Sequence, residues 1–409
     1  DRRPGRAAAV IPGDAPDHAP AGGNGDARAS AAAAPPAAGI GDLVRDRSIV
    51  VCCGSGGVGK TTTAAVVALE GARLGRKTVV VTIDPAKRLA DALGLQGLSD
   101  TPSRIQGAWP GELWATMLDT KSTFDALVMK HAGDPEQGRR ILANRFYRNI
   151  SGALSGTQEY MAMEKLYELH DETDFDLVVV DTPPSRHALD FLDAPRRLSR
   201  FLDHRLFRLL IAPGRGIAKA VNVAAQTFLR TVSRVVGGEV VDDAVAFFQA
   251  FEGMEEGFRQ RAARVNELLA APGTAFVLVA SPRRDTVDEA HYFADRLHEA
   301  DIAVQGLIVN RVHPAFGLGE RGDGPRGISA AAAAGAASRA ESLAGTPVGD
   351  LYRNLADFQA VASREHAHLA GLAETVAPAP VAWVPFLSTD VHDLDGLGEI
   401  AGHVFPAAG

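Results

Sequence analysis

Cysteine is nearly absent from this sequence. Two cysteines occur in 409 residues, Cys52 and Cys53, and they are adjacent within an apolar run. Neighbouring side chains on a strand point to opposite faces of a sheet, so the two are poor partners for one zinc ion. No CxxC pair occurs. A disulfide framework and a cysteine-ligated iron–sulfur centre are therefore excluded, and we expect a reducing, cytoplasmic location in which peripheral contact with a membrane stays open.

Long apolar runs and excess positive charge are also missing. No uninterrupted apolar run reaches the roughly 18 residues of a transmembrane helix, so we expect no transmembrane segment. The net charge is −8, and only seven of the 42 basic residues are lysine. A protein that binds nucleic acid usually has a basic surface, so we expect no nucleic-acid partner. With 46% apolar and 22% charged residues, the composition is that of a globular protein.

Two segments are of low complexity. Residues 1–45 consist mostly of Ala, Pro and Gly with isolated charges, which is too little apolar bulk to offset the entropy of ordering. We interpret them as a disordered leader and residues 46–409 as one α/β domain. A second such stretch covers about residues 315–342; its first half is expected to be a loop, and its alanine-rich half a helix.

The domain contains short apolar runs that end in polar, Gly or Pro residues. Because the runs are continuous rather than alternating, they predict strands that are covered on both faces. Helical stretches separate them, which predicts a doubly wound, mostly parallel sheet with functional residues at the carboxyl ends of its strands. The expected strands are SIVVCCG (48–54), TVVVTIDP (78–85), LWATMLD (113–119), DLVVVDTPP (176–184), AFVLVASP (275–282), GLIVNRV (306–312) and VAWVPF (381–386).

Residues of about 190–265 interrupt this rhythm, because they contain no strand candidate. Phe247, Phe251, Met254 and Phe258 recur there at helical spacing. The pattern predicts amphipathic helices that form an inserted helical subdomain. Two alternatives stay open: the apolar stripes pack on one another, or they form a groove for a hydrophobic client protein.

The stretch GSGGVGKT, residues 54–61, fits the pattern GxxxxGK[ST] between an apolar strand and a helix. This context indicates a phosphate-binding loop, or P-loop. Its glycines let backbone N–H groups converge on phosphate oxygens at the helix N-terminus. Lys60 is expected to reach the β- and γ-phosphates, and the Thr61 hydroxyl to bind Mg²⁺.

Polar residues end three other expected strands. Asp181 ends LVVVD, where a buried carboxylate is costly unless it binds a metal, usually through water; a helix cap is the alternative. Asp84 is placed to orient the attacking water, and a turn before Pro85 is its alternative. Asn310 ends GLIVN and is expected to contact an adenine edge, with a simple turn as the alternative.

These segments together resemble the ArsA-type ATPases, which include the arsenite-pump ATPase and the guided-entry ATPase that delivers tail-anchored membrane proteins. The resemblance rests on GSGGVGKTT, TIDPAKRLADALG, DTPPSRHALDFLDAP and a strand ending in Asn, in the order of that family. It covers roughly residues 47–390. It implies a P-loop ATPase that is a dimer and that switches conformation as it hydrolyses ATP with Mg²⁺. The helical segment takes the place of the client-binding or membrane-facing subdomain.

The resemblance also implies roles for individual residues. Lys60 and Asp84 are the expected catalytic residues, and Thr61 and Asp181 are expected to hold Mg²⁺, the latter through water. The expected second switch, which senses the γ-phosphate, contains Asp181, Thr182, Pro184 and His187. The expected nucleotide contacts are Gly56, Gly57, Val58, Gly59, Lys60, Thr61, Thr62, Asn310 and Pro385.

Ser55 departs from the family pattern. Members usually have a lysine there that reaches across the dimer to the partner's phosphates, whereas serine is neutral and too short. We therefore expect a heterodimer with an ArsA-like paralogue that carries the lysine, with a homodimer, Arg186 acting in cis, or a non-hydrolysing subunit as alternatives. The composition and the phrase DTPPSRHALDFLDAP resemble the actinobacterial branch, in which two such ATPases pair. The cysteines that bind arsenite or zinc in relatives have no counterpart, so neither role follows.

Overall fold

The computed structural model describes residues 39–84, 86–150, 157–183, 193–194, 197, 200, 238–250, 253–314 and 330–406. Four predicted site positions, Pro85, Pro184, Arg186 and His187, lie outside these residues. The same holds for most of the predicted leader, for much of the predicted helical subdomain and for the loop at 315–329.

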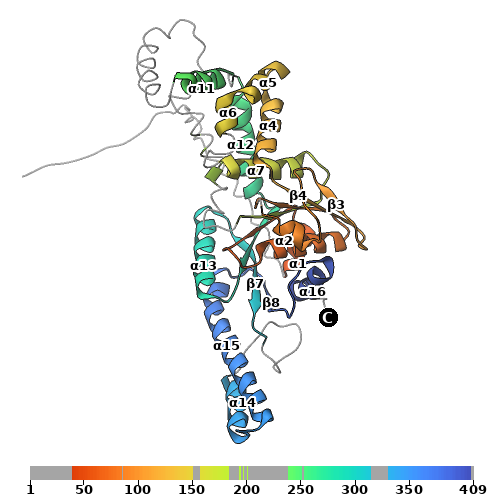
Figure 1. Ribbon diagram of the computed structural model, residues 1–409, viewed down its shortest axis with the longest axis vertical. Helices are drawn as coiled ribbons and strands as arrows, with labels where there is room; N and C mark the ends of the chain where they lie inside the picture. Colours follow the sequence, from red (N-terminus) through yellow and green to blue (C-terminus); the bar gives the residue numbers. More distant parts are fainter. Residues whose placement is uncertain are drawn as a thin grey trace, which may run out of the picture. The chain divides into compact units, whose positions relative to one another are not determined.

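An eight-stranded sheet forms the centre of the domain (Figure 1). Its order is β3-β4-β2-β5-β1-β6-β7-β8, and all neighbouring strands are parallel except β3 and β4. The strands are β1 (Ile49–Cys53), β2 (Lys77–Thr82), β3 (Ser103–Ile105), β4 (Glu112–Met117), β5 (Leu177–Asp181), β6 (Thr274–Ala280), β7 (Val304–Val312) and β8 (Val381–Pro385). All seven predicted strands are confirmed. The missed strand, β3, has three residues, two of them exposed, so it has no apolar run to reveal it.

Helices cover both faces of the sheet, as the continuous apolar strands predicted. One apolar cluster joins β1 residues such as Val50 to α1 (Ile40–Asp46), α2 (Lys60–Arg73), α3 (Arg88–Ala92) and α16 (Leu394–Val404). The other joins residues such as Val51 to α4 (Thr120–His131), α7 (Thr157–Asp171), α12 (Glu255–Ala270), α13 (Arg284–Glu299) and α15 (Pro347–Thr375). Cys52 belongs to the first cluster and Cys53 to the second, so adjacent cysteines do face opposite sides.

The described part of the predicted helical subdomain is helical and packed. It comprises α11 (Gly238–Ala250) and the start of α12, beside α5 (Pro135–Ala143) and α6 (Arg145–Ile150) (Figure 1). Phe247, Met254 and Phe258 are buried, and the Phe247 ring lies 5.7 Å from that of Phe146. Phe251 lies outside the described residues. These three side chains are therefore buried in the helical layer, whereas their packing against the other apolar stripe stays a prediction.

The ordered domain begins earlier than the sequence indicated. Helix α1 starts at Ile40, within the stretch of residues 1–45 predicted to be a disordered leader. Its apolar side chains Ile40, Leu43 and Val44 are buried beside α2, and this burial offsets the entropy of ordering the segment. The alanine-rich half of the second low-complexity stretch is a helix, α14 (Ala330–Ser342), which packs on α15. Among the described helices, none has the length and hydropathy needed to cross a bilayer.

Candidate nucleotide site

The loop between β1 and α2 has a backbone that only glycine can follow at two positions. Gly54 has φ = 150°, and a Cβ there would lie 2.1 Å from the Val279 carbonyl oxygen. Gly59 caps α2 with φ = 94°, and its Cβ would lie 2.2 Å from Nδ2 of Asn310. The loop therefore passes directly over the ends of β6 and β7. It leads into the first turn of α2, whose free N–H groups and dipole favour an anion.

Lys60 points back into this loop. Its side chain is buried, and Nζ donates a hydrogen bond to the backbone carbonyl oxygen of Ser55 at 2.7 Å. Burial lowers the pKa of the ammonium, whereas the charge of nearby Asp181 acts to raise it. Ser55 is itself buried, and its hydroxyl has no hydrogen-bond partner among the described residues.

Asp181 is the acidic centre of the site. It pairs in register with Cys52 of β1 on one side and with Thr82 of β2 on the other. Its Oδ2 accepts a hydrogen bond from the Thr82 hydroxyl at 2.8 Å, whereas its buried Oδ1 accepts none from the described residues. Burial raises the pKa of this carboxyl to about 6, against the opposing effects of the Thr61 and Thr82 hydroxyls and of Lys60.

These features fit a divalent cation at this place. A buried carboxylate oxygen without a donor, next to the hydroxyl of Thr61, is the oxygen-rich environment that Mg²⁺ prefers. The described groups that bond Asp181 are the threonine hydroxyls of Thr82 and Thr61 rather than a helix N–H, so the helix-cap alternative finds no support among the described residues.

Asp84 lies on the loop after β2, next to Thr82 and Asp181. Its Oδ1 accepts a hydrogen bond from the Ala86 N–H at 3.0 Å, which is the turn interaction that was its alternative role. Its backbone N–H donates to the Thr82 hydroxyl at 3.2 Å. The other oxygen, Oδ2, lies 3.5 Å from Nη1 of Arg88. The carboxylate is thus held near Asp181 while one oxygen faces the exposed guanidinium of Arg88.

Asn310 contacts the P-loop itself. Its Nδ2 donates to the Val58 carbonyl oxygen at 2.8 Å, and Nη1 of Arg311 donates to that of Gly57 at 3.2 Å. The end of β7 therefore holds the loop in shape. Pro385 ends β8, opposite Val312 in register, and the contacts of Asn310 and Pro385 with adenine stay predictions.

Thr182 links the start of the expected second switch to β1, because its hydroxyl donates to the Cys52 carbonyl oxygen at 2.8 Å. Sequence reasoning missed two partners of the acidic residues. Thr82 reads as an ordinary strand residue, and only its pairing with Asp181 shows its role. Arg88 stands four residues after Asp84 on a short helix, a spacing that was available as a signal.

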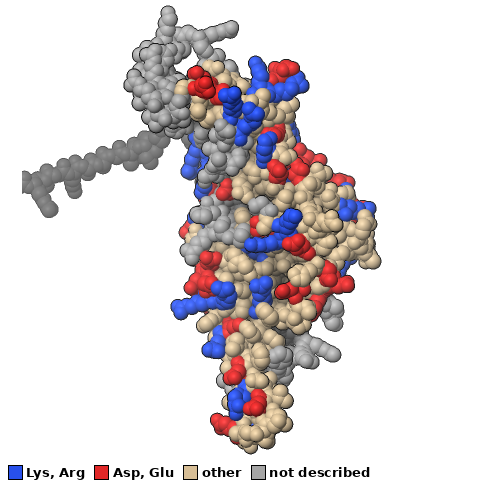
Figure 2. Space-filling model, in the orientation of Figure 1, with Lys and Arg blue, Asp and Glu red and all other residues tan. Residues whose placement is uncertain are grey.

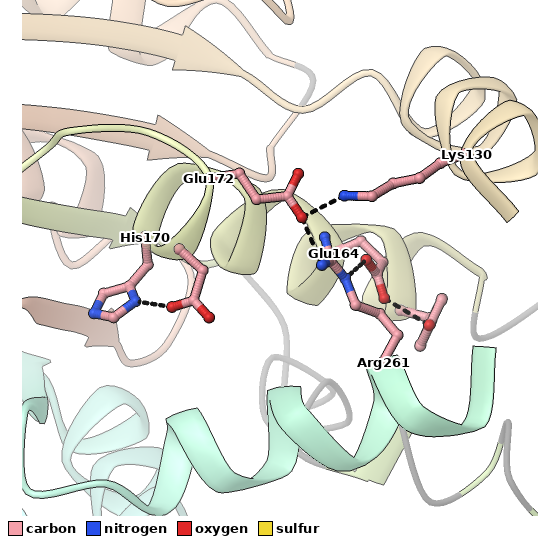
Figure 3. A network of polar contacts seen from close by, with 7 residues as sticks. Lys130, Glu164, His170, Glu172 and Arg261 are labelled. Carbon is pink, nitrogen blue, oxygen red and sulfur yellow. Dashed lines mark hydrogen bonds and ion pairs between the residues drawn. The ribbon is translucent and has the colours of Figure 1, made fainter. Parts of the chain in front are cut away.

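Helix α7, which precedes β5, connects this site to the helical layer. At its start, Nε2 of Gln158 donates to the Ile83 carbonyl oxygen at 3.3 Å, one residue before Asp84. In its middle, Oε2 of Glu164 accepts from Nε of Arg261 on α12 at 2.7 Å (Figure 3). Arg261 also bonds Glu172 through Nη1 at 2.6 Å, and Glu172 pairs in turn with Lys130 of α4 (Figure 3).

Glu164 is the buried member of this network. The Tyr160 hydroxyl donates to its Oε1 at 2.6 Å. Burial raises the pKa of the Glu164 carboxyl even though Arg261 and Tyr160 bind it. Helix α7, which precedes the strand of Asp181, is therefore linked to α12 by a desolvated ion pair.

The two cysteines are buried as protonated, unreactive thiols. Burial raises the pKa of the Cys53 thiol to about 12 and that of Cys52 well above its ordinary value. Metal binding and nucleophilic attack require the thiolate, so neither thiol serves this site at neutral pH.

Comparison with known proteins agrees with this geometry. The sequence profile of the ArsA ATPase family, described as anion-transporting ATPases, matches residues 47–317. The chain is 27% identical over 263 residues to an ATPase ASNA1 homolog of Dictyostelium discoideum, which is 63% of this chain and 70% of that protein. It is 24% identical over 262 residues to ATPase GET3A of Arabidopsis thaliana, 63% of this chain and 65% of that protein.

A putative arsenical pump-driving ATPase of Halobacterium salinarum is 31% identical over 171 residues, 40% of this chain and 26% of that protein. The matched segments thus cover from 26% to 70% of the lengths of these three relatives. The profile covers more than half of the chain and includes the P-loop, both acidic residues and β7, the strand that carries Asn310. By this match and by the arrangement of the site, the chain belongs to the anion-transporting ATPase family.

Proposed function

We propose that this chain binds ATP with Mg²⁺ at the β1–α2 loop and hydrolyses it. The observation that carries the proposal is the meeting of buried Lys60, Asp181 and Asp84 at the carboxyl ends of three strands. Thr61 and Asp181, the latter through water, would hold Mg²⁺, which neutralises charge on the β- and γ-phosphates.

The residues of the chain then have distinct tasks. The backbone N–H groups of Gly56 to Thr62 bind the phosphates, and the ammonium of Lys60 leaves the Ser55 carbonyl for the β- and γ-phosphates. Asp84 orients the attacking water: one of its oxygens is engaged in the turn, and the other lies beside the exposed guanidinium of Arg88. Asn310 keeps the loop in its glycine-specific path.

We further infer that the ATPase works as a dimer that closes on ATP and reopens after hydrolysis, through the second switch that contains Pro184 and His187. A paralogue with the lysine that Ser55 replaces is one proposed partner, and a second copy of this chain is the other. The actinobacterial-like composition supports the paralogue. The apolar residues Phe247, Met254 and Phe258 are buried, so a client surface would need the helical layer to rearrange.

A non-hydrolysing nucleotide-binding subunit is the second candidate. The observation that favours it is Ser55, a neutral, buried side chain where the resemblance implies a cation. The two candidates share nucleotide binding and differ in turnover, so one set of variants separates them.

The test measures ATP turnover and nucleotide binding by calorimetry, for the chain alone and mixed with an ArsA-like paralogue. In an ATPase, Asp84→Asn keeps binding and loses about 100-fold or more in turnover, and Lys60→Ala loses both. Asp174→Asn removes an exposed carboxylate that pairs with Lys77 and serves as the control. Nucleotide binding without turnover, both for the chain alone and for the mixture, supports the non-hydrolysing subunit. Absence of nucleotide binding contradicts both candidate functions.

A further inference from the structure

We propose that Arg88 is a catalytic residue that supplies a positive charge to the γ-phosphoryl group in cis. Its guanidinium lies beside Asp84 and transfers to the γ-phosphate oxygens as the reaction proceeds. The inference rests on the proposed hydrolysis of ATP and deepens it. It also makes a lysine from a partner chain unnecessary for turnover.

The position of Arg88 is the first support. It is the first residue of α3, on the segment that follows β2, and Nη1 lies 3.5 Å from Oδ2 of Asp84. The Asp84 carboxylate is mostly buried, whereas 59% of the Arg88 side chain is exposed.

The weakness of the present contact is the second support. An ion pair of 3.5 Å with a half-exposed arginine contributes little to stability and is easily exchanged. An ordinary helix-surface pair joins two exposed side chains, whereas here one partner is a carboxylate at the carboxyl end of a central strand. The guanidinium therefore lies near the expected phosphate site, and its weak contact with Asp84 leaves it able to change partner.

The chemistry requires such a group. The charge of the transition state is spread over the γ-phosphate oxygens, and a planar guanidinium can bind two of them at once. Ser55, the position at which a cation is implied by the family resemblance, is neutral and buried. Among the described residues, Arg88 is the arginine that pairs with the proposed water-orienting carboxylate.

The transfer of the Arg88 guanidinium from Asp84 to the γ-phosphate also accounts for the order of the steps in hydrolysis. The water oxygen forms a bond to the γ-phosphorus while the bond to the β–γ bridging oxygen breaks. The electron pair leaves with ADP, and the proton of the water ends on the phosphate product. While Arg88 holds Oδ2, Asp84 is restrained; once the guanidinium binds phosphate, that oxygen is free to accept the hydrogen bond of the water.

The test compares Arg88→Ala, Arg88→Lys and the control Arg45→Ala. Arg45 is also 59% exposed and pairs with a carboxylate, Asp42, on α1. We expect Arg88→Ala to lower kcat by about 100- to 1,000-fold, with ADP affinity changed by less than about threefold. Affinity for ADP with aluminium fluoride, which imitates the transferred phosphoryl group, falls with kcat. Added methylguanidinium restores turnover to Arg88→Ala, Arg88→Lys recovers only part of it, and Arg45→Ala resembles the wild type.

The outcomes are distinguishable from those of the proposed function. Turnover of Arg88→Ala within about threefold of the wild type would overturn this inference and leave the ATPase proposal standing. A loss that methylguanidinium does not restore, with ADP and the aluminium fluoride complex weakened equally, would also overturn it by showing a structural role. Absence of turnover in the wild type, alone and with a paralogue, contradicts the proposed hydrolysis and with it this inference.

Discussion

Gly57 and Gly59 of the P-loop both have positive φ, but a Cβ would meet different surroundings at each. Gly57 has φ = 78°, and no atom lies within 4 Å of the place where a Cβ would stand. At Gly59, with φ = 94°, the Cβ would lie 2.2 Å from Nδ2 of Asn310. A side chain at Gly57 therefore meets only backbone strain, whereas one at Gly59 also displaces the side chain that holds the loop.

Alanine substitutions separate these two effects. Gly57→Ala is expected to lower the free energy of unfolding by about 1–2 kcal/mol, the strain of a left-handed backbone. Gly59→Ala should cost more and should also weaken ADP binding, because the hydrogen bond from Asn310 to Val58 is lost. Urea unfolding and calorimetry measure both quantities. Adding Asn310→Ala to Gly59→Ala should recover part of the stability; if it does not, the clash is not the cause.

At the scale of elements, α7 connects the loop of Asp84 and the strand of Asp181 to the helical layer. Gln158 donates to the Ile83 carbonyl oxygen beside Asp84, the helix leads into the strand of Asp181, and Glu164 pairs with Arg261 of α12. A shift of either end of α7 therefore acts on a buried ion pair, in which removing one partner leaves the other charge uncompensated.

The buried Glu164 predicts a particular dependence of stability on pH. Its pKa is raised in the folded state, so the folded protein binds the proton more tightly than the unfolded chain does. The stability due to this group is complete below its unfolded pKa, near 4.5, and declines as pH rises through the folded value. We expect the unfolding free energy of the wild type to fall relative to that of Glu164→Gln from about pH 4.5 upward.

Urea unfolding of both proteins across that pH range measures the difference. Glu168→Gln, on the same helix, removes an exposed carboxylate that pairs with Lys165 and controls for loss of charge. Parallel pH profiles of the wild type and Glu164→Gln would contradict the interpretation of Glu164 as a desolvated acid.

At the scale of the whole molecule, the surface shows charges of both signs. On the face shown in Figure 2, basic and acidic side chains are interspersed over the described residues, with no continuous basic field. The net charge of −8 likewise indicates that basic residues are not in excess. The face shown therefore lacks the continuous basic field that is usual on surfaces that bind nucleic acid.

The proposed dimer switch predicts that assembly depends on the nucleotide. Asp84→Asn with ATP and Mg²⁺ should hold the closed state, so its sedimentation coefficient should exceed that of the same protein with ADP. Ultracentrifugation of the chain alone and with an ArsA-like paralogue measures this. A monomer in every nucleotide state and mixture would contradict the dimer. If Arg88 acts in cis, turnover per chain should agree within about threefold between the two kinds of dimer.

What the sequence by itself determined was local. The P-loop is a pattern of eight consecutive residues, and the seven longer strands are continuous apolar runs, so neighbours along the chain suffice to predict both. The placement of Asp84, Asp181 and Asn310 at strand ends followed from the same runs. The short strand β3 and the helix α1 escaped, because neither has an apolar run that distinguishes it from a loop or leader.

Only the tertiary structure decided which distant side chains meet. Thr82 bonds Asp181 across 99 positions, Arg261 bonds Glu164 across 97, and Asn310 bonds the Val58 carbonyl across 252. Such contacts depend on the order and register of the strands and on how helices pack over them. Apolar runs do not encode these features, because each run is compatible with many neighbours in a sheet. Arg88, the partner of Asp84, is near it in sequence, yet only the pairing of the surrounding strands shows that this ion pair lies beside Asp181.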